Sequence, residues 1–170
     1  MDIKRVLIVG SISIKLTVSP WALLWVKNFK EFGFEVKLFD QRAAVRAFGL
    51  NFKEIFPKIH ELFVKIMNKK LLNLVKKWRP DMAFFIKGDL VFPSTILQIK
   101  KLGVTTILWS PDDPWLFYEI SRNIATVYDY IITASEKCVP WYRHIGCKHV
   151  TYMPYTVSYT HLTLPTTERV

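Results

Sequence analysis

The sequence predicts an α/β protein with a Rossmann-like, doubly wound parallel sheet, and three observations support that fold class. Short apolar runs rich in β-branched residues recur along the chain. Segments with an apolar residue at every third or fourth position separate these runs, as in amphipathic helices. Glycine, serine and aspartate gather in the short loops between them. Alternating strands and helices form right-handed βαβ units, whose functional face lies at the carboxyl ends of the strands.

The chain begins with a strand and a helix. Residues 4–9 contain the apolar run Val6–Val9, which ends at Gly10 and is typical of a strand buried on both faces. A helix then begins at Ser19 and Pro20, because serine suits the cap and proline suits the first helical position. Apolar residues recur at helical spacing from there until Gly33, which ends the pattern.

A second strand and a long helical region follow. Residues 34–39 form the strand, and Asp40 closes it. Residues 52–78 carry apolar side chains at a three-to-four spacing over several turns, which predicts one or two helices. Pro57 belongs in a first turn, since deeper in a helix it would remove a hydrogen bond and clash with the preceding turn.

The second half of the chain repeats the alternation of strands and helices. Residues 82–86 and 104–109 are apolar and rich in strand formers, and a helix over 93–102 connects them. The remaining elements are expected as a helix over 114–124, a strand over 128–133, a helix over 135–145 and a short strand over 149–153. Together these segments predict six parallel strands in one sheet.

Composition limits both the class of protein and its partners. The chain has 170 residues, of which 51% are hydrophobic and 22% charged, so it suits one globular domain and not a disordered chain, a collagen or a disulfide scaffold. Its 24 Lys and Arg against 14 Asp and Glu give a net charge of +10, which favours a phosphorylated ligand, a nucleic acid or an anionic lipid as partner.

The two cysteines lack metal-site spacing, which predicts a reducing, cytoplasmic location and no metal centre. No window approaches the roughly 18 uninterrupted apolar residues of a spanning helix, because Lys or Arg recurs throughout the apolar stretches, so we expect a soluble or peripherally membrane-bound protein.

The last residues differ in composition from the rest of the chain. Residues 157–170 show no amphipathic period, and Val157 to Thr166 resembles the conceptual translation of a transposase sequencing adapter. We therefore expect one domain over residues 1–156, a non-native tail over 157–170, and a natural protein that continues beyond this point. A native threonine-rich hairpin is the alternative interpretation of the tail.

The loop after the first strand argues against nucleotide cofactors. It begins Gly10-Ser11 and is poor in glycine compared with a dinucleotide fingerprint, and no GxxxxGK[ST] sequence occurs in the chain. A dehydrogenase or a P-loop enzyme is therefore disfavoured, and we expect no dinucleotide cofactor. Gly10 and Ser11 remain candidates for substrate binding, because backbone N–H groups and a hydroxyl at a strand end face the crevice. The alternative is a turn with no ligand.

Two adjacent carboxylates form the most informative candidate site. Asp112 and Asp113 lie between two prolines at the end of a buried strand, so their directions are fixed near the expected cleft. One of them could accept a proton from an attacking hydroxyl while the other binds a neighbouring hydroxyl or caps the helix that Pro114 begins. The alternative is that both are only helix caps.

Lys87 and Gly88 follow another strand and form a second candidate site. The lysine could bind a phosphate or sugar oxygen, and the glycine would let a ligand approach the backbone. The alternative is a solvated loop.

Most of the excess positive charge lies on the predicted helical region over residues 53–79. Eight basic residues stand there against Glu54 and Glu61, a net charge of +6. A basic amphipathic helix of this kind is typical of peripheral contact with an anionic membrane, with its apolar residues docked on the sheet. The alternative is a solvated helix face. Nucleic-acid binding is not expected, because the aromatic residues fall on core periods and form no stacking pattern.

Several short motifs, in this order and spacing, resemble one family. They are Arg5–Gly10, Glu35–Asp40, Trp78–Asp81, Lys87–Gly88, Thr106–Pro114, Tyr128–Thr133, and Gly146 ahead of Val150–Pro154. Together they resemble the N-terminal half of CgeB-like spore-maturation proteins, which look like GT-B glycosyltransferases. The resemblance spans residues 4–155. Its most distinctive element is Trp-x-x-Asp-Asp-Pro, which adds Trp109 to the expected substrate-binding residues.

The resemblance implies a two-domain glycosyltransferase. Its N-terminal, acceptor-side domain would be the one seen here, and a missing C-terminal domain would bind the nucleotide sugar, a co-substrate and not a cofactor. The enzyme would transfer a sugar to a hydroxyl acceptor, with Gly10, Asp112 and Asp113 in the cleft and one of the two carboxylates as base or acceptor clamp. This part of the enzyme alone is expected to be inactive. The alternative is a stand-alone Rossmann-like module that binds a phosphorylated ligand or an anionic membrane surface.

Overall fold

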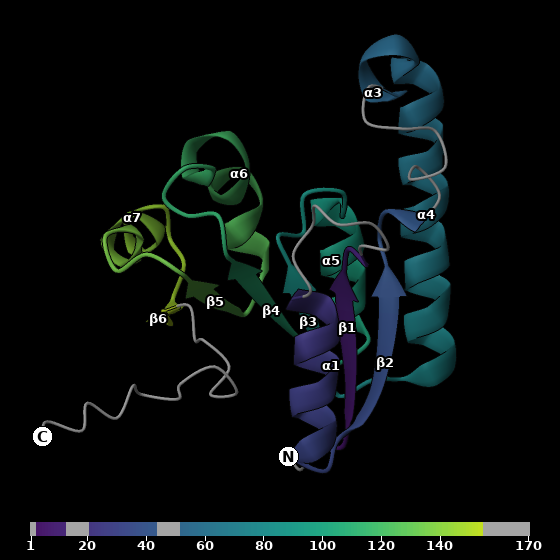
Figure 1. Cartoon of the computed structure of the whole chain (residues 1–170), viewed down its shortest axis with the longest axis horizontal. Helices are drawn as coiled ribbons and strands as arrows, with labels where there is room; N and C mark the ends of the chain where they lie inside the picture. Colours follow the sequence, from purple (N-terminus) through teal and green to yellow (C-terminus); the bar gives the residue numbers. More distant parts are fainter. Residues whose placement is uncertain (1–2, 13–20, 44–51, 155–170) are drawn as a thin grey trace, which may run out of the picture.

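The computed structural model describes residues 3–12, 21–43 and 52–154, which form one parallel sheet with helices on both faces (Figure 1). The strands are β1 (Arg5–Gly10), β2 (Glu35–Asp40), β3 (Met82–Ile86), β4 (Thr105–Ser110), β5 (Tyr130–Thr133) and β6 (His149–Tyr152). The helices are α1 (Trp21–Glu31), α3 (Phe52–Ile55), α4 (Pro57–Trp78), α5 (Pro93–Lys101), the π-helix η1 (Phe117–Ser121), α6 (Arg122–Ile124), the 3-10 helix η2 (Ala125–Val127) and α7 (Cys138–His144). The predicted α/β fold with a doubly wound parallel sheet is confirmed.

The strand order places the switch point of the sheet beside β1. The order is β2-β1-β3-β4-β5-β6, and every neighbouring pair is parallel. From β1 the chain crosses to β2 on one side and then to β3 on the other. In open sheets of this type, ligands bind outside the carboxyl ends of the strands at such a reversal. The loops after β1 and β3 are therefore the first places to search for a site.

Each face of the sheet buries its own apolar cluster. On one face α1 covers a cluster whose buried members are Val6, Ile8, Ala22, Met82, Phe84, Ile86 and Trp109. On the other face α4, α5 and α7 cover a larger cluster that includes Leu7, Leu71, Phe85, Ile96 and Tyr142. Successive residues of β1 enter opposite clusters because strand side chains alternate. This explains why the strand sequences are continuously apolar.

A half-buried carboxylate fixes the amino end of β1. Asp81 accepts hydrogen bonds from the backbone N–H groups of Lys4 at 2.9 Å and Arg5 at 2.8 Å. These two bonds hold the pKa of the Asp81 carboxyl below its usual value. The Arg5 guanidinium in turn donates to the carbonyl of Trp78 at 2.6 Å. Residues far apart in sequence thus set the register between β1 and the segment that leads into β3.

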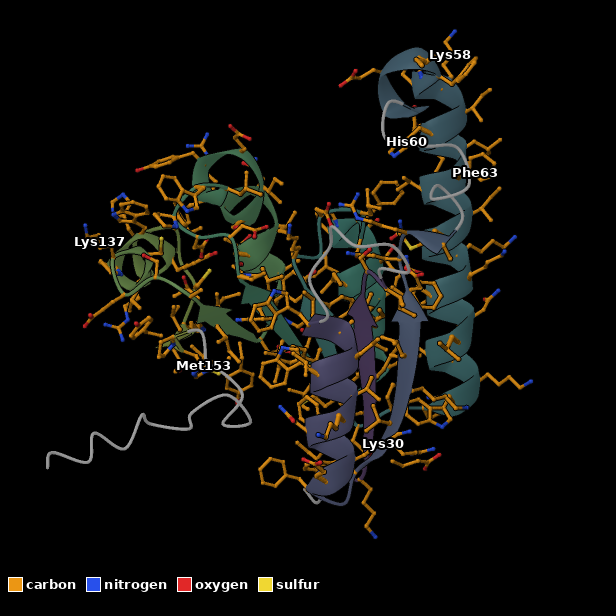
Figure 2. The ribbon with its side chains drawn as sticks, in the orientation of Figure 1. Lys30, Lys58, His60, Phe63, Lys137 and Met153 are labelled. Carbon is orange, nitrogen blue, oxygen red and sulfur yellow. The ribbon has the colours of Figure 1, made fainter. Side chains whose placement is uncertain are left out.

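Helix α4 is longer than the sheet needs. It begins at Pro57, which confirms the prediction that this proline lies in a first turn, and α3 precedes it as a separate short helix. Its second half packs on the sheet through Leu71 and Val75, both fully buried. Its first half and α3 extend past the carboxyl ends of β1 and β2, and Lys58 lies near the outer end (Figures 1 and 2).

The helix predicted over residues 114–124 is wrong in its start and its type. The chain turns through 111–116, and the helical segment begins as the π-helix η1, followed by the short helices α6 and η2. Pro114 is therefore not a first helical residue, and neither Asp112 nor Asp113 caps a helix there. The physical reason is that the Asp113 side chain points into the protein, where it accepts hydrogen bonds from three hydroxyls. A backbone bond from Ser121 N–H to the Leu116 carbonyl, five residues back, then forms the wide π turn.

Other predictions differ from the structure at their ends. Strand β5 begins at Tyr130, because the Tyr128 N–H bonds back to Ala125 and the Asp129 N–H bonds to the Thr106 carbonyl. The expected helix start at Ser19 and Pro20 lies outside the described residues, as do residues 157–170. Cys138 and Cys147 are both buried and unpaired.

Candidate functional site

Lys87 and Asp112 form an ion pair at the carboxyl edge of the sheet. Lys87 directly follows β3 and Asp112 lies just after β4, and because these strands are neighbours the two side chains meet. The ammonium and the Oδ2 atom are in direct contact, yet 40% of the lysine side chain and 36% of the aspartate side chain remain exposed. Both side chains therefore keep exposed surface, although the Asp112 Oδ2 atom that contacts the lysine is itself buried. A narrow hollow of about 10 Å³ lies beside them, lined by Ser110, Leu116 and Ser121, which is room for about one water molecule.

The backbone at Lys87 is strained. Its φ is 66°, in the left-handed region that lysine rarely adopts, and Gly88 follows with a φ of 63°. The Lys87 N–H donates to the Trp109 carbonyl at 2.9 Å, which ties the turn to β4. Residues held in such conformations cluster at binding and active sites, where the surrounding structure fixes them. The strained turn is a second, independent indication that this edge is functional.

Asp113 has a different environment from its neighbour. It is buried and accepts hydrogen bonds from the hydroxyls of Thr133 at 2.7 Å, Tyr142 at 2.8 Å and Ser121 at 3.2 Å. Burial raises the pKa of the Asp113 carboxyl above its usual value, although the three hydroxyls oppose that shift. The carboxylate therefore holds the loop after β4 against β5 and α7. Of the adjacent pair, Asp112 is the one that solvent and a ligand can reach.

Three other predicted site residues have packing roles. A Cβ added to Gly10 would lie 3.1 Å from Ile86 Cδ1 and 3.3 Å from Ala22 Cβ, so glycine lets α1 approach β1 and β3. A Cβ on Gly88 would lie 2.6 Å from the Tyr128 hydroxyl. Trp109 is 2% exposed and stacks edge-on against Trp21 and Trp25 beneath α1.

Ser11 differs from those three residues. It is half-buried in the loop that follows β1, at the switch point of the sheet. Ser11, Lys87 and Asp112 are therefore the predicted residues that keep surface at the carboxyl edge. The substrate-binding roles of Gly10, Gly88 and Trp109 stay predictions.

The sequence interpretation missed a second ion pair at the same edge. Arg42, after β2, contacts Asp89, after β3, and 41% of the arginine side chain is exposed. Gln41 donates to Asp89 Oδ1 at 3.2 Å, and Asp40 accepts from the Arg42 N–H at 3.0 Å. The only signal in the sequence is that these polar residues directly follow two strand ends. The edge thus carries two cation–carboxylate pairs in a row, at the ends of neighbouring βα units.

Aromatic side chains lie close to this edge as well. Trp115 is 82% exposed and Tyr118 is 57% exposed, and both belong to the segment after Asp113. The Tyr118 ring packs against Trp141, with ring centroids 5.6 Å apart, and the Arg122 guanidinium lies 5.6 Å from its centroid. Exposed aromatic faces of this kind stack on flat or apolar ligands. The neighbourhood of Asp112 therefore combines charge with apolar surface.

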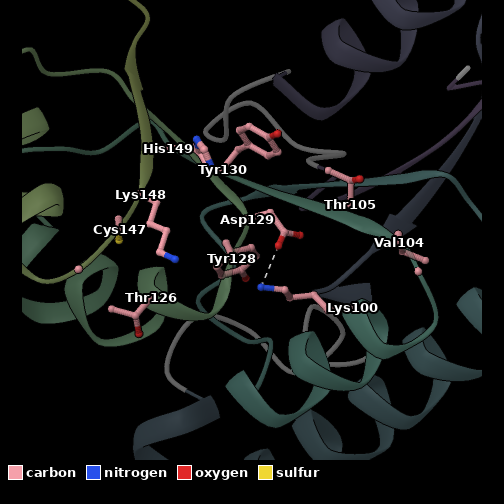
Figure 3. A pocket seen from close by; sticks show the side chains of 12 residues that line it. Lys100, Val104, Thr105, Thr126, Tyr128, Asp129, Tyr130, Cys147, Lys148 and His149 are labelled. Atoms are coloured by element: carbon pink, nitrogen blue, oxygen red, sulfur yellow. Dashed lines mark ion pairs between the residues drawn. The ribbon is translucent and has the colours of Figure 1, made fainter. Parts of the chain in front are cut away.

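A second hollow lies at the opposite end of the sheet (Figure 3). It measures about 590 Å³ and is lined by residues around the amino ends of β4, β5 and β6. Lys100 and Asp129 face each other there at 2.8 Å, and Asp129 also accepts hydrogen bonds from Thr106. Their charges are satisfied within the protein. Because ligands of open α/β sheets bind at the carboxyl ends, this hollow is not the candidate site.

No group of three or more His, Cys, Asp or Glu side chains is placed to hold a metal ion within residues 3–12, 21–43 and 52–154. None of the helices in those ranges combines the length and hydropathy of a membrane span.

Comparison with known proteins gives one relative among curated sequences. No protein-family model matches the chain. The chain is similar to the spore protein CgeB of Bacillus subtilis (strain 168), with 23% identity over 109 residues. The match covers 63% of this chain and 34% of the Bacillus protein. The resemblance to CgeB-like proteins that the motifs predict is confirmed over that part of the chain.

A solved structure has the same fold. The chain is similar to Glycyrrhiza uralensis UGT73P12, solved with glycyrrhetinic acid 3-O-monoglucuronide, with a TM-score of 0.55 and 10% identity over 87% of this chain and 48% of that one. The glycosyltransferase SnogD from Streptomyces nogalater is similar with a TM-score of 0.47 and 16% identity, over 92% of this chain and 52% of that one. The fold is the Rossmann-like α/β fold of GT-B glycosyltransferases. The chain spans less than two thirds of the length of each of these proteins.

Proposed function

We propose that this chain is the acceptor-side half of a glycosyltransferase that moves a sugar from a nucleotide-sugar donor to a hydroxyl acceptor. The observation that supports it most is the half-exposed Asp112 carboxylate, paired with Lys87 at the carboxyl edge of a sheet with the fold of GT-B glycosyltransferases. A donor-binding domain encoded downstream completes the cleft in this proposal. The 170-residue chain by itself is then inactive in transfer.

The chemistry assigns different tasks to the two aspartates. Asp112 accepts the proton of the acceptor hydroxyl as the oxygen attacks the anomeric carbon of the sugar. A new C–O bond forms there, and the bond from that carbon to the nucleotide diphosphate breaks, with the electron pair leaving on the diphosphate. Lys87 orients the Asp112 carboxylate. Asp113 is a positioning residue, because its three hydroxyl partners fix the loop that carries Asp112.

The test is made on the natural protein with its downstream domain, identified by sequencing the source DNA beyond residue 156. Nucleotide release from a panel of nucleotide sugars is measured with and without hydroxyl acceptors. Asp112→Asn is expected to lower kcat by about 10²–10⁴-fold, the usual contribution of a general base, with an unchanged circular dichroism spectrum. Asp129→Asn, in the hollow at the opposite edge, is the control and should leave kcat within about twofold. Full turnover in the Asp112 variant would contradict the role given to this residue.

A second candidate function is a stand-alone module that binds a phosphorylated ligand. The observation in its favour is that Lys87 and Arg42 both keep cationic surface at the carboxyl edge. A module would bind inorganic pyrophosphate or a nucleoside diphosphate as the 170-residue chain, and would do so without any downstream domain. Titration calorimetry with these two probes, on the chain and on Lys87→Met, distinguishes the two functions. If the 170-residue chain binds either probe and Lys87→Met removes that binding, the result supports the function of a stand-alone binding module.

A further inference from the structure

An apolar stripe runs along the outward face of the α3–α4 projection. Three residues of α4, Ile59, Leu62 and Ile66, are 46%, 56% and 40% exposed, and Ile55 at the end of α3 is 64% exposed. The spacing of three and four residues within α4 places its three members on one side of the helix. We call Ile55, Ile59, Leu62 and Ile66 the outer stripe. Large aliphatic residues at these positions are unexpected on a helix face that only meets water.

The outer stripe is distinct from the face by which α4 docks on the protein. The docked face is formed by Val64, Met67, Leu71 and Val75, all buried. Asn68 adds polar contacts on that side, donating to the Leu90 carbonyl and accepting from the Phe92 N–H, each at 2.9 Å. Helical periodicity puts the outer stripe opposite these residues. Sheet packing therefore accounts for one apolar face of α4 and leaves the other without a function.

Lysines flank the outer stripe. Lys58, Lys65 and Lys69 follow one side of it, Lys70 begins the other, and all four are exposed. Glu61 is the single acidic residue of α4, and it pairs with Lys65 at 2.6 Å. The remaining lysines have no carboxylate of this helix to pair with. Figure 2 shows Lys58 near the tip, where the projection stands clear of the strands.

We infer that the α3–α4 projection binds the surface of an anionic bilayer, with the outer stripe in the acyl-headgroup boundary and the lysines at the lipid phosphates. An apolar stripe flanked by lysines is the pattern of interfacial helices, and each lysine near such a surface adds to binding. A second copy of this chain is disfavoured as the occupant, since it would bring like charges together. A nucleic acid would contact the lysines but not bury the stripe. This inference does not depend on the proposed glycosyl transfer.

The position of the stripe on the protein agrees with this use. Ile59, Leu62 and Ile66 of the outer stripe belong to the half of α4 that extends, with α3, past the carboxyl ends of β1 and β2 (Figure 1). The helical region over residues 53–79 as a whole holds +6 of the chain's net charge of +10, and five of those charges are Lys69, Lys70, Lys76, Lys77 and Arg79, which follow the outer stripe in the sequence. Apolar insertion and electrostatic attraction are therefore concentrated on one element. Interfacial binding of this kind should require both.

The first test is vesicle sedimentation with the 170-residue chain. We expect binding to phosphatidylcholine vesicles that contain about 30% phosphatidylglycerol, weak binding to phosphatidylcholine alone, and at least a tenfold loss in high salt. Ile59→Gln with Leu62→Gln should lower the affinity at least tenfold. The matched control is Leu97→Gln, a 47% exposed leucine of α5, which should stay within about twofold. Lys69→Glu with Lys70→Glu should abolish binding, whereas Lys101→Glu should not.

The second test separates insertion from simple adsorption. Leu62→Cys and Leu97→Cys are each labelled with an environment-sensitive fluorophore, which is practical because both native cysteines are buried. A blue shift on anionic vesicles at position 62, absent at position 97, is expected. Absence of binding to anionic vesicles at low salt would overturn the inference. Binding that is removed by the lysine substitutions but not by the two glutamine substitutions would also overturn it. So would a concentration-dependent dimerisation of the chain that Leu62→Gln abolishes.

Discussion

The hydroxyl of Tyr142 donates to Oδ2 of Asp113 at 2.8 Å and thereby joins α7 to the loop after β4. The same oxygen accepts from the Thr133 hydroxyl at 2.7 Å, and the Tyr142 hydroxyl also contacts Ser110 Oγ at 3.0 Å. One buried carboxylate thus connects β4, β5, η1 and α7. The position of its neighbour Asp112, the candidate base, depends on this network.

Removal of either donor should destabilise the protein without unfolding it. Tyr142→Phe and Thr133→Val each delete one hydrogen bond to a buried carboxylate, which we expect to cost about 1.5–3 kcal/mol of the free energy of unfolding. Because both donors bind the same oxygen, the double variant should differ from the sum of the single effects. Urea unfolding of the four proteins measures the cycle. Strict additivity would show that the two hydroxyls act independently of each other and would contradict their coupling through the shared oxygen.

The raised pKa of Asp113 gives the stability a defined pH dependence. Burial raises the pKa of this carboxyl in the folded state above its ordinary value of 3.8. Between pH 3.8 and the folded-state pKa, the native state therefore binds more protons than the unfolded state. The contribution of Asp113 to stability is therefore largest at low pH and falls as pH rises from 3.8 through the folded-state pKa. Asp113→Asn cannot titrate, so wild type should lose stability relative to this variant over that interval. A relative gain by wild type with rising pH would contradict the assignment.

The strained backbone of Lys87 should make two small substitutions at this position differ in their effect on stability. Lys87→Gly and Lys87→Ala both remove the ion pair with Asp112, but glycine adopts a φ of 66° without steric cost. We expect the glycine variant to be more stable than the alanine variant by about 1 kcal/mol. Thermal unfolding compares them directly. Equal stabilities would mean that the turn relaxes when the lysine is removed.

Substitution of Gly88 should be far more damaging than the same change in an open turn. Gly88→Ala places a methyl group 2.6 Å from the Tyr128 hydroxyl at a φ of 63°, and a loss of about 2–4 kcal/mol is expected. Gly103→Ala is the control, because its φ is 81° but no atom lies within 4 Å of the added Cβ. That change should cost about 1 kcal/mol. The extra loss at position 88 should shrink in a Tyr128→Phe background, where the clashing hydroxyl is absent.

Much of the fold follows from the sequence because the strands are short apolar runs separated by helices with their own period. The five residues of β3, Met82–Ile86, are predicted with the correct ends, since polar residues bound them on both sides. The segment after Asp113 is not predicted correctly. Its helix start depends on Asp113 turning inward, and that direction is set by hydroxyls that arrive from β5 and α7 later in the chain.

The candidate site is predictable only in part for the same reason. Asp112 and Lys87 each stand out as polar residues after a strand, yet their pairing requires β3 and β4 to be neighbours. The roles of Gly88 and Trp109 depend on what packs against them, Tyr128 in one case and the tryptophans of α1 in the other. Local sequence carries no record of these partners. Spacing therefore locates the edge of the sheet and leaves its contacts to the tertiary structure.

The bonds from Lys4 and Arg5 to Asp81 also have a consequence during synthesis. The residues joined are separated by 77 and 76 positions. At about 5–20 residues per second, the ribosome needs about 4–15 seconds to make that interval. During this time β2 is the only strand of the sheet that can pair with β1. The edge of β1 that later pairs with β3 stays unpaired, and the side chains of β1 are apolar. The nascent chain is therefore most in need of chaperone protection before Met82 leaves the exit tunnel.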